Sequence, residues 1–318
     1  MAWNRLLGLS LIVVLVQSQE FWLDYDDFAE PESELDEAII SKMIEKPKQS
    51  PGLCAVVIED GEIAWEGYYG WADIDKRVPV TKDTFFATAN ISKTITVATV
   101  MKMVEYGLDL DSDINTYLSF KVVNPNYPDI PITLRQLLTH TSSLLDNTVI
   151  IEMFTVNGDF QKPLGDTMEC YFAEDDEFYD ADFNFGKEAP GEEYNYSDMG
   201  TSLAAYVAAS FATATIMMDE EIYFEELAYI FVLEPLGIYG AAFHLDDMDQ
   251  SQIATPYVQT NDGKLHSQPH IGSMAYPAGL LRATCREIAT FLMMFMNNGT
   301  YNGIEILEEA SVAEIKRV

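Results

Sequence analysis

Residues 84–96 read TFFATANISKTIT, and this stretch places an amide three residues before an amine, Asn90 before Lys93. It leads into an apolar run, residues 91–106, that is typical of a buried helix. Side chains at positions i and i+3 of a helix lie on one face, with Cβ atoms roughly 5–6 Å apart. We therefore expect Asn90 to face Lys93, whereas Ser92, two positions after Asn90, points to a different face.

The wider run, residues 51–118, resembles the β-lactamase-related family of Ser-x-x-Lys hydrolases, which includes penicillin-binding proteins, D-peptidases and esterases. In that family the serine attacks a carbonyl and the lysine takes its proton. Here the tetrad reads Asn-Ile-Ser-Lys, so the resemblance places Asn90 at the nucleophile position. An amide nitrogen has a delocalised lone pair and no ionisable proton near neutral pH, so we do not expect Asn90 to attack.

A second motif of the resemblance is PGEEYNYSDMGTSLAAYVA, residues 190–208. Its family counterpart contains Tyr-x-Asn, in which the tyrosine works with the lysine to move a proton. Tyr196, Ser197 and Asp198 occupy these places, so the tyrosine is kept and the asparagine has become aspartate. If Asp198 approaches Lys93, its carboxylate stabilises the charged ammonium, and an ammonium is a poor base. The resemblance thus assigns catalytic places to Asn90, Lys93 and Tyr196, and pocket places to Ser92 and Asp198.

Two further segments extend the resemblance. Residues 276–299 are similar to the family's Pro-Ala-Gly-Gly-Leu turn and the helix after it, and Gly279 keeps part of that motif as a pocket residue. Residues 132–146 (ITLRQLLTHTSSLLD) resemble the family's Leu-Leu-Thr-His-Thr-Ser segment. His140 in that segment is expected to be a hydrogen-bonded structural residue rather than a base.

The family's third motif, a Lys-Thr-Gly or His-x-Gly strand, is not found where the resemblance would place it, beyond the equivalent of residues 306–318. Residues 270–272 spell His-x-Gly, but they precede the turn at Gly279, so we expect a loop there. Two explanations stay open: the chain is C-terminally incomplete, which we favour, or it is a truncated paralogue with an exposed sheet edge.

The resemblance implies an α+β, β-lactamase/transpeptidase-like fold: an antiparallel sheet flanked by helices, plus an inserted, mainly helical domain. The α/β part is expected at about residues 46–108 and 273–318, and the helical insert at about 109–272. Alternating strands on either side of the Asp60, Gly61 pair predict a hairpin within the sheet.

The N-terminus predicts the compartment. Arg5 precedes the apolar run 6–16, and Ser18 offers a small residue for cleavage, so residues 1–18 have the layout of a secretory signal peptide. The apolar run is too short to span a bilayer, although a short membrane anchor is the alternative. Residues 19–45 would form an acidic leader and a first helix. We expect a secreted or secretory-pathway lumen protein, free of membrane after cleavage.

The charge balance excludes whole classes of partner. Acidic residues number 52 and basic residues 18, for a net charge of −34, which repels nucleic acid and anionic lipid. The acidic residues concentrate in segments 24–37 and 173–193, which we interpret as solvated surface. Divalent cation binding is the alternative, but neither segment has the twelve-residue spacing of a calcium loop. No metal and no cofactor are therefore predicted.

The chain contains three cysteines, Cys54, Cys170 and Cys285. An odd number leaves at least one unpaired. Cys54 lies in an apolar, strand-like run and is expected to be a buried free thiol, whereas a bridge between Cys170 and Cys285 is possible.

Two functions follow from the resemblance. The first is a catalytically impaired, ligand-binding or interaction pseudoenzyme that accepts a small acyl or peptide-like ligand. The alternative is an active esterase, amidase or β-lactamase-like hydrolase that uses Lys93 and Tyr196 with a non-standard nucleophile, for which Ser92 is the nearest candidate. The sequence predicts no oligomeric state.

Overall fold

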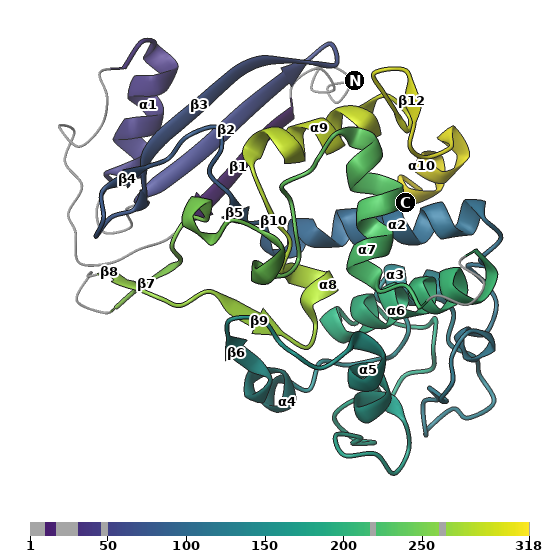
Figure 1. Cartoon of the computed structure of the whole chain (residues 1–318). Coiled ribbons are helices and arrows are strands. Elements are labelled where there is room, and N and C mark those ends of the chain that lie inside the picture. Colours follow the sequence, from purple (N-terminus) through teal and green to yellow (C-terminus); the bar gives the residue numbers. More distant parts are fainter. Residues whose placement is uncertain (1–9, 17–30, 46–49, 217–220, 261–264, 318) are drawn as a thin grey trace. The chain divides into compact units, whose positions relative to one another are not determined.

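The computed structural model describes residues 10–16, 31–45, 50–216, 221–260 and 265–317 (Figure 1). Its contacts divide the chain into two compact units. Unit 1 comprises Met1–Thr88, Gly240–His270 and Arg282–Asn297, and unit 2 comprises Ala89–Tyr239, Ile271–Leu281 and Asn298–Val318. Both units are built from discontinuous segments. The domain boundaries expected near residues 108 and 272 stay a prediction.

Unit 1 contains an antiparallel four-stranded sheet in the order β1, β2, β3, β4 (Figure 1). Its strands are β1 (Ser10–Val16), β2 (Gly52–Glu59), β3 (Glu62–Asp73) and β4 (Val78–Pro79). Asp60 and Gly61, which join β2 to β3, both have positive φ, 53° and 81°, as a tight hairpin turn requires. The predicted hairpin is confirmed. β1 lies within the predicted signal peptide, residues 1–18, whose cleavage stays a prediction.

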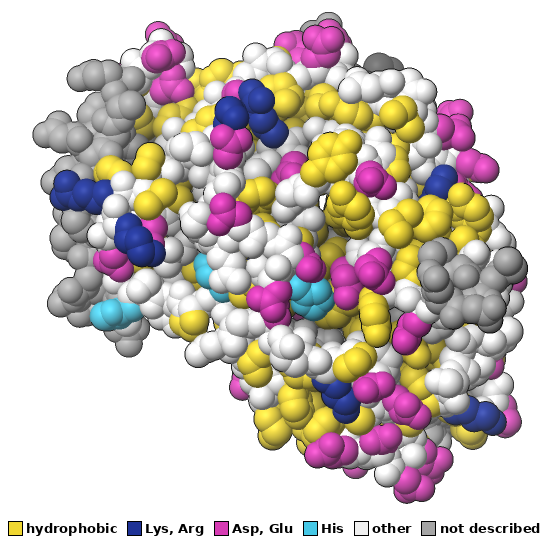
Figure 2. All heavy atoms as spheres, viewed as in Figure 1, with side chains coloured by type: hydrophobic (Ala, Val, Ile, Leu, Met, Phe, Trp, Pro, Cys, Tyr) yellow, Lys and Arg dark blue, Asp and Glu magenta, His cyan; other side chains and the backbone are white. Residues whose placement is uncertain are grey.

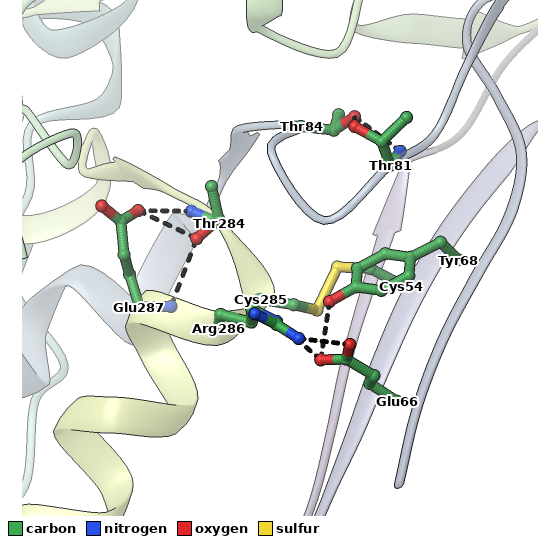
Figure 3. Close-up of a disulfide and its surroundings, with 9 residues drawn as sticks. All are labelled: Cys54, Glu66, Tyr68, Thr81, Thr84, Thr284, Cys285, Arg286 and Glu287. Carbon is green, nitrogen blue, oxygen red and sulfur yellow. Dashed lines mark hydrogen bonds and ion pairs between the residues drawn. A yellow bond between two sulfur atoms is a disulfide. The ribbon is translucent and has the colours of Figure 1, made fainter. Parts of the chain in front are cut away.

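Helices flank this sheet because successive residues of β2 point to opposite faces. On one face, Leu53 and Ala55 pack against Ile40 and Met43 of helix α1 (Glu34–Met43). On the other face, Cys54 forms a disulfide with Cys285, the first residue of helix α9 (Cys285–Met296), with Cα atoms 6.2 Å apart (Figure 3).

The disulfide corrects the sequence interpretation of the cysteines. The expectation that Cys54 is a free thiol was wrong, and so was the possible Cys170 to Cys285 bridge, because Cys170 is the free cysteine. Beside the disulfide, Arg286 pairs with Glu66 of β3, with Nε 2.7 Å from Oε2 (Figure 3). Hydrogen bonding to Arg286 lowers the pKa of the Glu66 carboxyl.

Shorter elements complete unit 1. They are β5 (Phe86–Ala87) paired with β10 (Arg282–Ala283), β7 (Tyr257–Gln259) paired with β8 (Leu265–Ser267), and the 3₁₀ turns η6 (Leu245–Asp247) and η7 (Gln250–Gln252).

Unit 2 is mainly helical, and its centre is the packing of α2 (Ser92–Glu105) against α6 (Asp198–Thr215). The buried positions of α6 are rich in alanine, including Ala204, Ala205 and Ala208, and small side chains let neighbouring helices approach closely. The helix expected over 91–106 is thus confirmed, and Gly107, with φ 106°, follows its end.

The other helices of unit 2 are α3 (Leu134–Leu138), α4 (Thr148–Met153), α5 (Leu164–Phe172), α7 (Phe224–Ala228), α8 (Tyr276–Gly279) and α10 (Glu309–Ile315). The turns η3 (Ile114–Thr116) and η5 (Glu234–Leu236), the π-helical segment η4 (Tyr229–Leu233), and the hairpin of β11 (Thr300–Tyr301) with β12 (Ile304–Glu305) also belong to it. None of the helices in the described part of the chain has the length and apolarity needed to span a membrane.

The expectation of a loop at residues 270–272 was wrong. Ile271–Ser273 forms strand β9 and pairs antiparallel with β6 (Thr155–Asn157). A Cβ atom at Gly272 would clash with the backbone of Gly158 and Phe160. Gly272 therefore permits the backbones of β9 and residues 158–160 to approach closely. A glycine in a sequence is compatible with a turn or with such an approach, and the sequence alone does not distinguish them.

Candidate active site

The start of α2 holds the first candidate residues. The 3₁₀ turn η2 (Ala89–Ile91) leads directly into α2. Asn90 Oδ1 accepts a hydrogen bond from Lys93 Nζ at 3.2 Å, so the two side chains face each other as their spacing predicts. Ser92 has no exposed surface, and its Oγ accepts a hydrogen bond from the Leu281 N–H at 3.0 Å. Ser92 thus points into the interior of unit 2, away from Asn90.

Lys93 is surrounded by oxygen atoms. Besides Asn90, its Nζ lies 2.8 Å from the Ala278 carbonyl oxygen and 2.6 Å from Asp198 Oδ1, and 5.0 Å from the centre of the Tyr196 ring. An ammonium group has three N–H donors and no acceptor. The three close oxygens, one of them charged, and the ring face match the donor groups of a lysine side chain.

Tyr196 lies at the same place but is held as a neutral phenol. Burial raises the pKa of its hydroxyl, and the neighbouring Asp198 carboxylate raises it further through its charge and a hydrogen bond. A phenol that keeps its proton can donate a hydrogen bond but cannot act as a base. The Asp198 carboxylate therefore acts on both residues: it forms an ion pair with Lys93 and raises the pKa of Tyr196.

The start of α6, which carries Asp198, is fixed by Asp146. One carboxylate oxygen of Asp146 accepts from Ser197 Oγ at 2.9 Å and from the Met199 N–H at 3.0 Å, and the other accepts from the Asp198 N–H at 2.8 Å. A carboxylate at a helix N-terminus is stabilised by the free N–H groups and the helix dipole. Asp146 is a positioning residue that the sequence interpretation missed.

His140 supports the same turn. Its Nδ1 accepts a hydrogen bond from the Ser197 N–H at 3.2 Å, and its ring lies 4.6 Å from the ring of Tyr196. Burial lowers the pKa of His140, and the charge of Lys93 lowers it further, so the imidazole is neutral and can accept. The expectation of a hydrogen-bonded histidine is confirmed by this contact.

Helix α8 also contributes to the site around Lys93. Thr96 Oγ1 donates to the Pro277 carbonyl oxygen at 2.7 Å, which ties α2 to α8 and presents the Ala278 carbonyl to Lys93. A Cβ atom at Gly279 would meet nothing within 4 Å, so this residue borders open space. The structure thus brings together Asn90, Lys93, Tyr196 and Asp198 beside Gly279, and leaves Ser92 outside.

Among the residues that the structure describes, no group of three or more His, Cys, Asp and Glu residues could hold a metal ion. Asp109 and Asp113, two acidic residues that follow α2, each accept a hydrogen bond from a nearby backbone N–H group. The predicted lack of a metal and of a cofactor stays a prediction.

Comparison with known proteins gives the family. Residues 39–315 match the family model described as Beta-lactamase. The chain belongs to the β-lactamase family. It is similar to Protein flp of Staphylococcus aureus (strain N315), with 21% identity over 262 residues that cover 81% of this chain and 48% of that protein. It is also similar to the human serine beta-lactamase-like protein LACTB, mitochondrial, with 32% identity over 103 residues, which are 30% of this chain and 18% of LACTB.

A solved structure shows the same fold. The octameric penicillin-binding protein homologue from Pyrococcus abyssi matches with a TM-score of 0.69 and 24% identity, over 88% of this chain and 58% of that one. The α+β, β-lactamase/transpeptidase-like fold is therefore confirmed. The chain spans about half the length of Protein flp.

Proposed function

We propose that this β-lactamase family member is a catalytically impaired pseudoenzyme that binds a small acyl or peptide-like ligand without forming a covalent intermediate. The observation that carries this proposal is the contact between Asn90 Oδ1 and Lys93 Nζ, 3.2 Å apart, at the place where the family's serine would meet its lysine. An amide there accepts a hydrogen bond from the lysine and offers no nucleophilic oxygen.

The second departure supports the same proposal. Asp198 Oδ1 lies 2.6 Å from Lys93 Nζ, and its carboxylate also raises the pKa of Tyr196. General base catalysis needs a group that can take a proton near the working pH. A lysine paired with a carboxylate and a tyrosine that retains its proton are both poorly suited to that task.

The alternative, an active hydrolase with another nucleophile, finds little support at Ser92. A nucleophile must reach the ligand, yet Ser92 is buried and its oxygen accepts the Leu281 N–H. Ser197, the next serine near the group, is also buried, and its hydroxyl donates to Asp146.

Ligand binding is supported by the exposure of Asn90. Within the described part of the chain, its Nδ2 donates no hydrogen bond, so it could donate to a ligand carbonyl.

We further propose a secreted or secretory-pathway lumen location, without nucleic acid or membrane partners after signal cleavage. The layout of residues 1–18 supports the location, and the net charge of −34, with acidic side chains frequent on the face in Figure 2, supports the lack of nucleic-acid and anionic-lipid partners.

The proposal is tested by separating binding from turnover. Ligand affinity is measured by calorimetry with an N-acetylated dipeptide, and turnover by hydrolysis of p-nitrophenyl acetate, for the native chain and the Ser92→Ala variant. We expect measurable binding and, at most, the residual rate of about 10³–10⁴ over water that survives loss of a nucleophile. A faster native reaction that Ser92→Ala abolishes would establish the active hydrolase instead.

A further inference from the structure

Unit 1 contains a cavity that the candidate active site does not use. Its volume is about 820 Å³, within the usual range of small-molecule pockets. It is lined by residues from the end of β3 and from β4, by residues 81–84, by η7 with Ile253 and Thr255, and by residues 268–270. All of these segments belong to unit 1.

His270 is the most informative group in this cavity. It is half-buried, and its imidazole makes no hydrogen bond to any residue that the structure describes. Burial lowers the pKa of His270, and the charge of Arg282 lowers it further, so the ring is neutral. A neutral imidazole offers one donor and one acceptor. The half-buried ring is therefore open to a ligand that can satisfy both nitrogens.

Three glutamines add acceptors to the same cavity, and each uses its amide nitrogen locally. Gln250 Nε2 donates to the Leu245 carbonyl, Gln252 Nε2 to Asp249, and Gln268 Nε2 to the His266 and Ser267 carbonyls. No hydrogen bond to their Oε1 atoms comes from the described residues. The groups left for a ligand are thus the three carbonyl acceptors and the second N–H of Gln250 and of Gln252, which favour a ligand whose groups both donate and accept.

The charged residues of the cavity are already paired. Asp73 Oδ2 lies 2.6 Å from Lys76 Nζ and accepts from Thr255 Oγ1 at 3.2 Å. Asp83 lies 2.8 Å from the ammonium of Lys82. Each carboxylate is already neutralised by a neighbouring ammonium group, so neither sign of ligand charge finds an unpaired partner. The cavity therefore favours an uncharged ligand.

Apolar side chains provide the remaining contact surface. Ile253 is buried at the cavity, and Val78 and Pro79 of β4 line it with exposed surface. A surface that combines exposed apolar patches with several acceptors fits a molecule with hydroxyl donors and C–H faces. Sugar rings have both properties.

We propose that this cavity binds an uncharged saccharide of about two rings, with His270 and the glutamine carbonyls hydrogen-bonding to its hydroxyl groups. The proposal is independent of the function assigned to the Asn90 site, because none of the residues at that site lines the cavity.

The test is calorimetric titration of the full chain with cellobiose and with N,N′-diacetylchitobiose. We expect at least one of them to bind, and the His270→Phe variant, which keeps a ring of similar size without nitrogens, to bind it at least tenfold more weakly. The matched control is His266→Phe, because His266 is an exposed histidine of β8 that does not line the cavity. This control should bind as the native chain does.

A second variant tests the proposal independently in case His270→Phe does not fold. Gln252→Met keeps the length of an exposed side chain and removes its carbonyl, and it should also weaken binding while the melting temperature stays near the native value. The proposal is overturned if neither sugar binds, if His270→Phe and Gln252→Met bind as tightly as the native chain, or if glucose 6-phosphate binds more tightly than both uncharged sugars.

Discussion

The starts of α2 and α6 meet at Lys93, yet they differ in what they retain. At the start of α6, the Asp146 carboxylate accepts three hydrogen bonds and His140 accepts a fourth, so the backbone that carries Tyr196 and Asp198 is fully supported. At the start of α2, no side chain caps the helix, and Asn90 stands where the family has its nucleophilic serine. The geometry of the site is therefore held from the α6 side, while the α2 side carries Asn90 without a capping side chain.

The largest effect on stability should come from removing the Asp146 carboxylate, which supports the start of α6. Asp146→Ala leaves the Ser197 hydroxyl and two backbone N–H groups without their acceptor, so we expect a loss of about 3 kcal/mol in the free energy of unfolding. Urea denaturation measures this. The control is Asp182→Ala in the exposed acidic segment, which should change stability by less than about 0.5 kcal/mol. Equal stabilities of the two variants would show that Asp146 does not stabilise the start of α6.

A smaller effect on stability is expected for Asp198→Asn. The Asp198 side chain is 37% exposed, so solvent screens its pair with Lys93, and the loss should be about 1 kcal/mol or less. The effect on chemistry should be larger than the effect on stability. In an Asn90→Ser background, Asp198→Asn should speed acylation by about tenfold or more, because a freed lysine is a better base. The rate of labelling by an acylating probe measures it, and an unchanged rate would remove Asp198 from the explanation of impairment.

The pH dependence of stability should give the smallest effect. Burial lowers the pKa of His140 in the folded state, whereas an unfolded histidine titrates near 6.5. The unfolded chain therefore binds the proton first, and stability falls as the pH drops below about 6.5 toward the folded pKa. Urea denaturation across this pH range should show a steeper fall for the native chain than for His140→Gln. Identical slopes would mean that His140 does not titrate differently on folding.

Local features of the fold could be predicted from the sequence. The alternation around Asp60 and Gly61 predicts the hairpin but not the register shift between Val57 and Ile58, and the 3.6-residue spacing predicts α2 and the contact between Asn90 and Lys93. Both features depend on residues close together in the chain.

Features that depend on distant residues were missed. Cys54 and Cys285 are separated by 231 residues, and they meet because β2 presents Cys54 to the helix that Cys285 begins. In the sequence, nothing distinguishes Asp146 from the many other acidic residues. Its role is visible only in the fold, where the start of α6 lies beside it. Strand β9 was overlooked because it has three residues, and its Gly272 is explained by the backbone of Gly158 alongside it.

We propose that the site is assembled and lacks its nucleophile. The most direct test of this proposal is covalent labelling by a fluorophosphonate probe, measured by intact mass on the native chain, on Asn90→Ser, and on Asn90→Ser with Asp198→Asn. We expect the native chain to stay unlabelled and at least the double variant to gain one adduct at position 90. Labelling of the native chain, or no adduct on any variant, would contradict the claim.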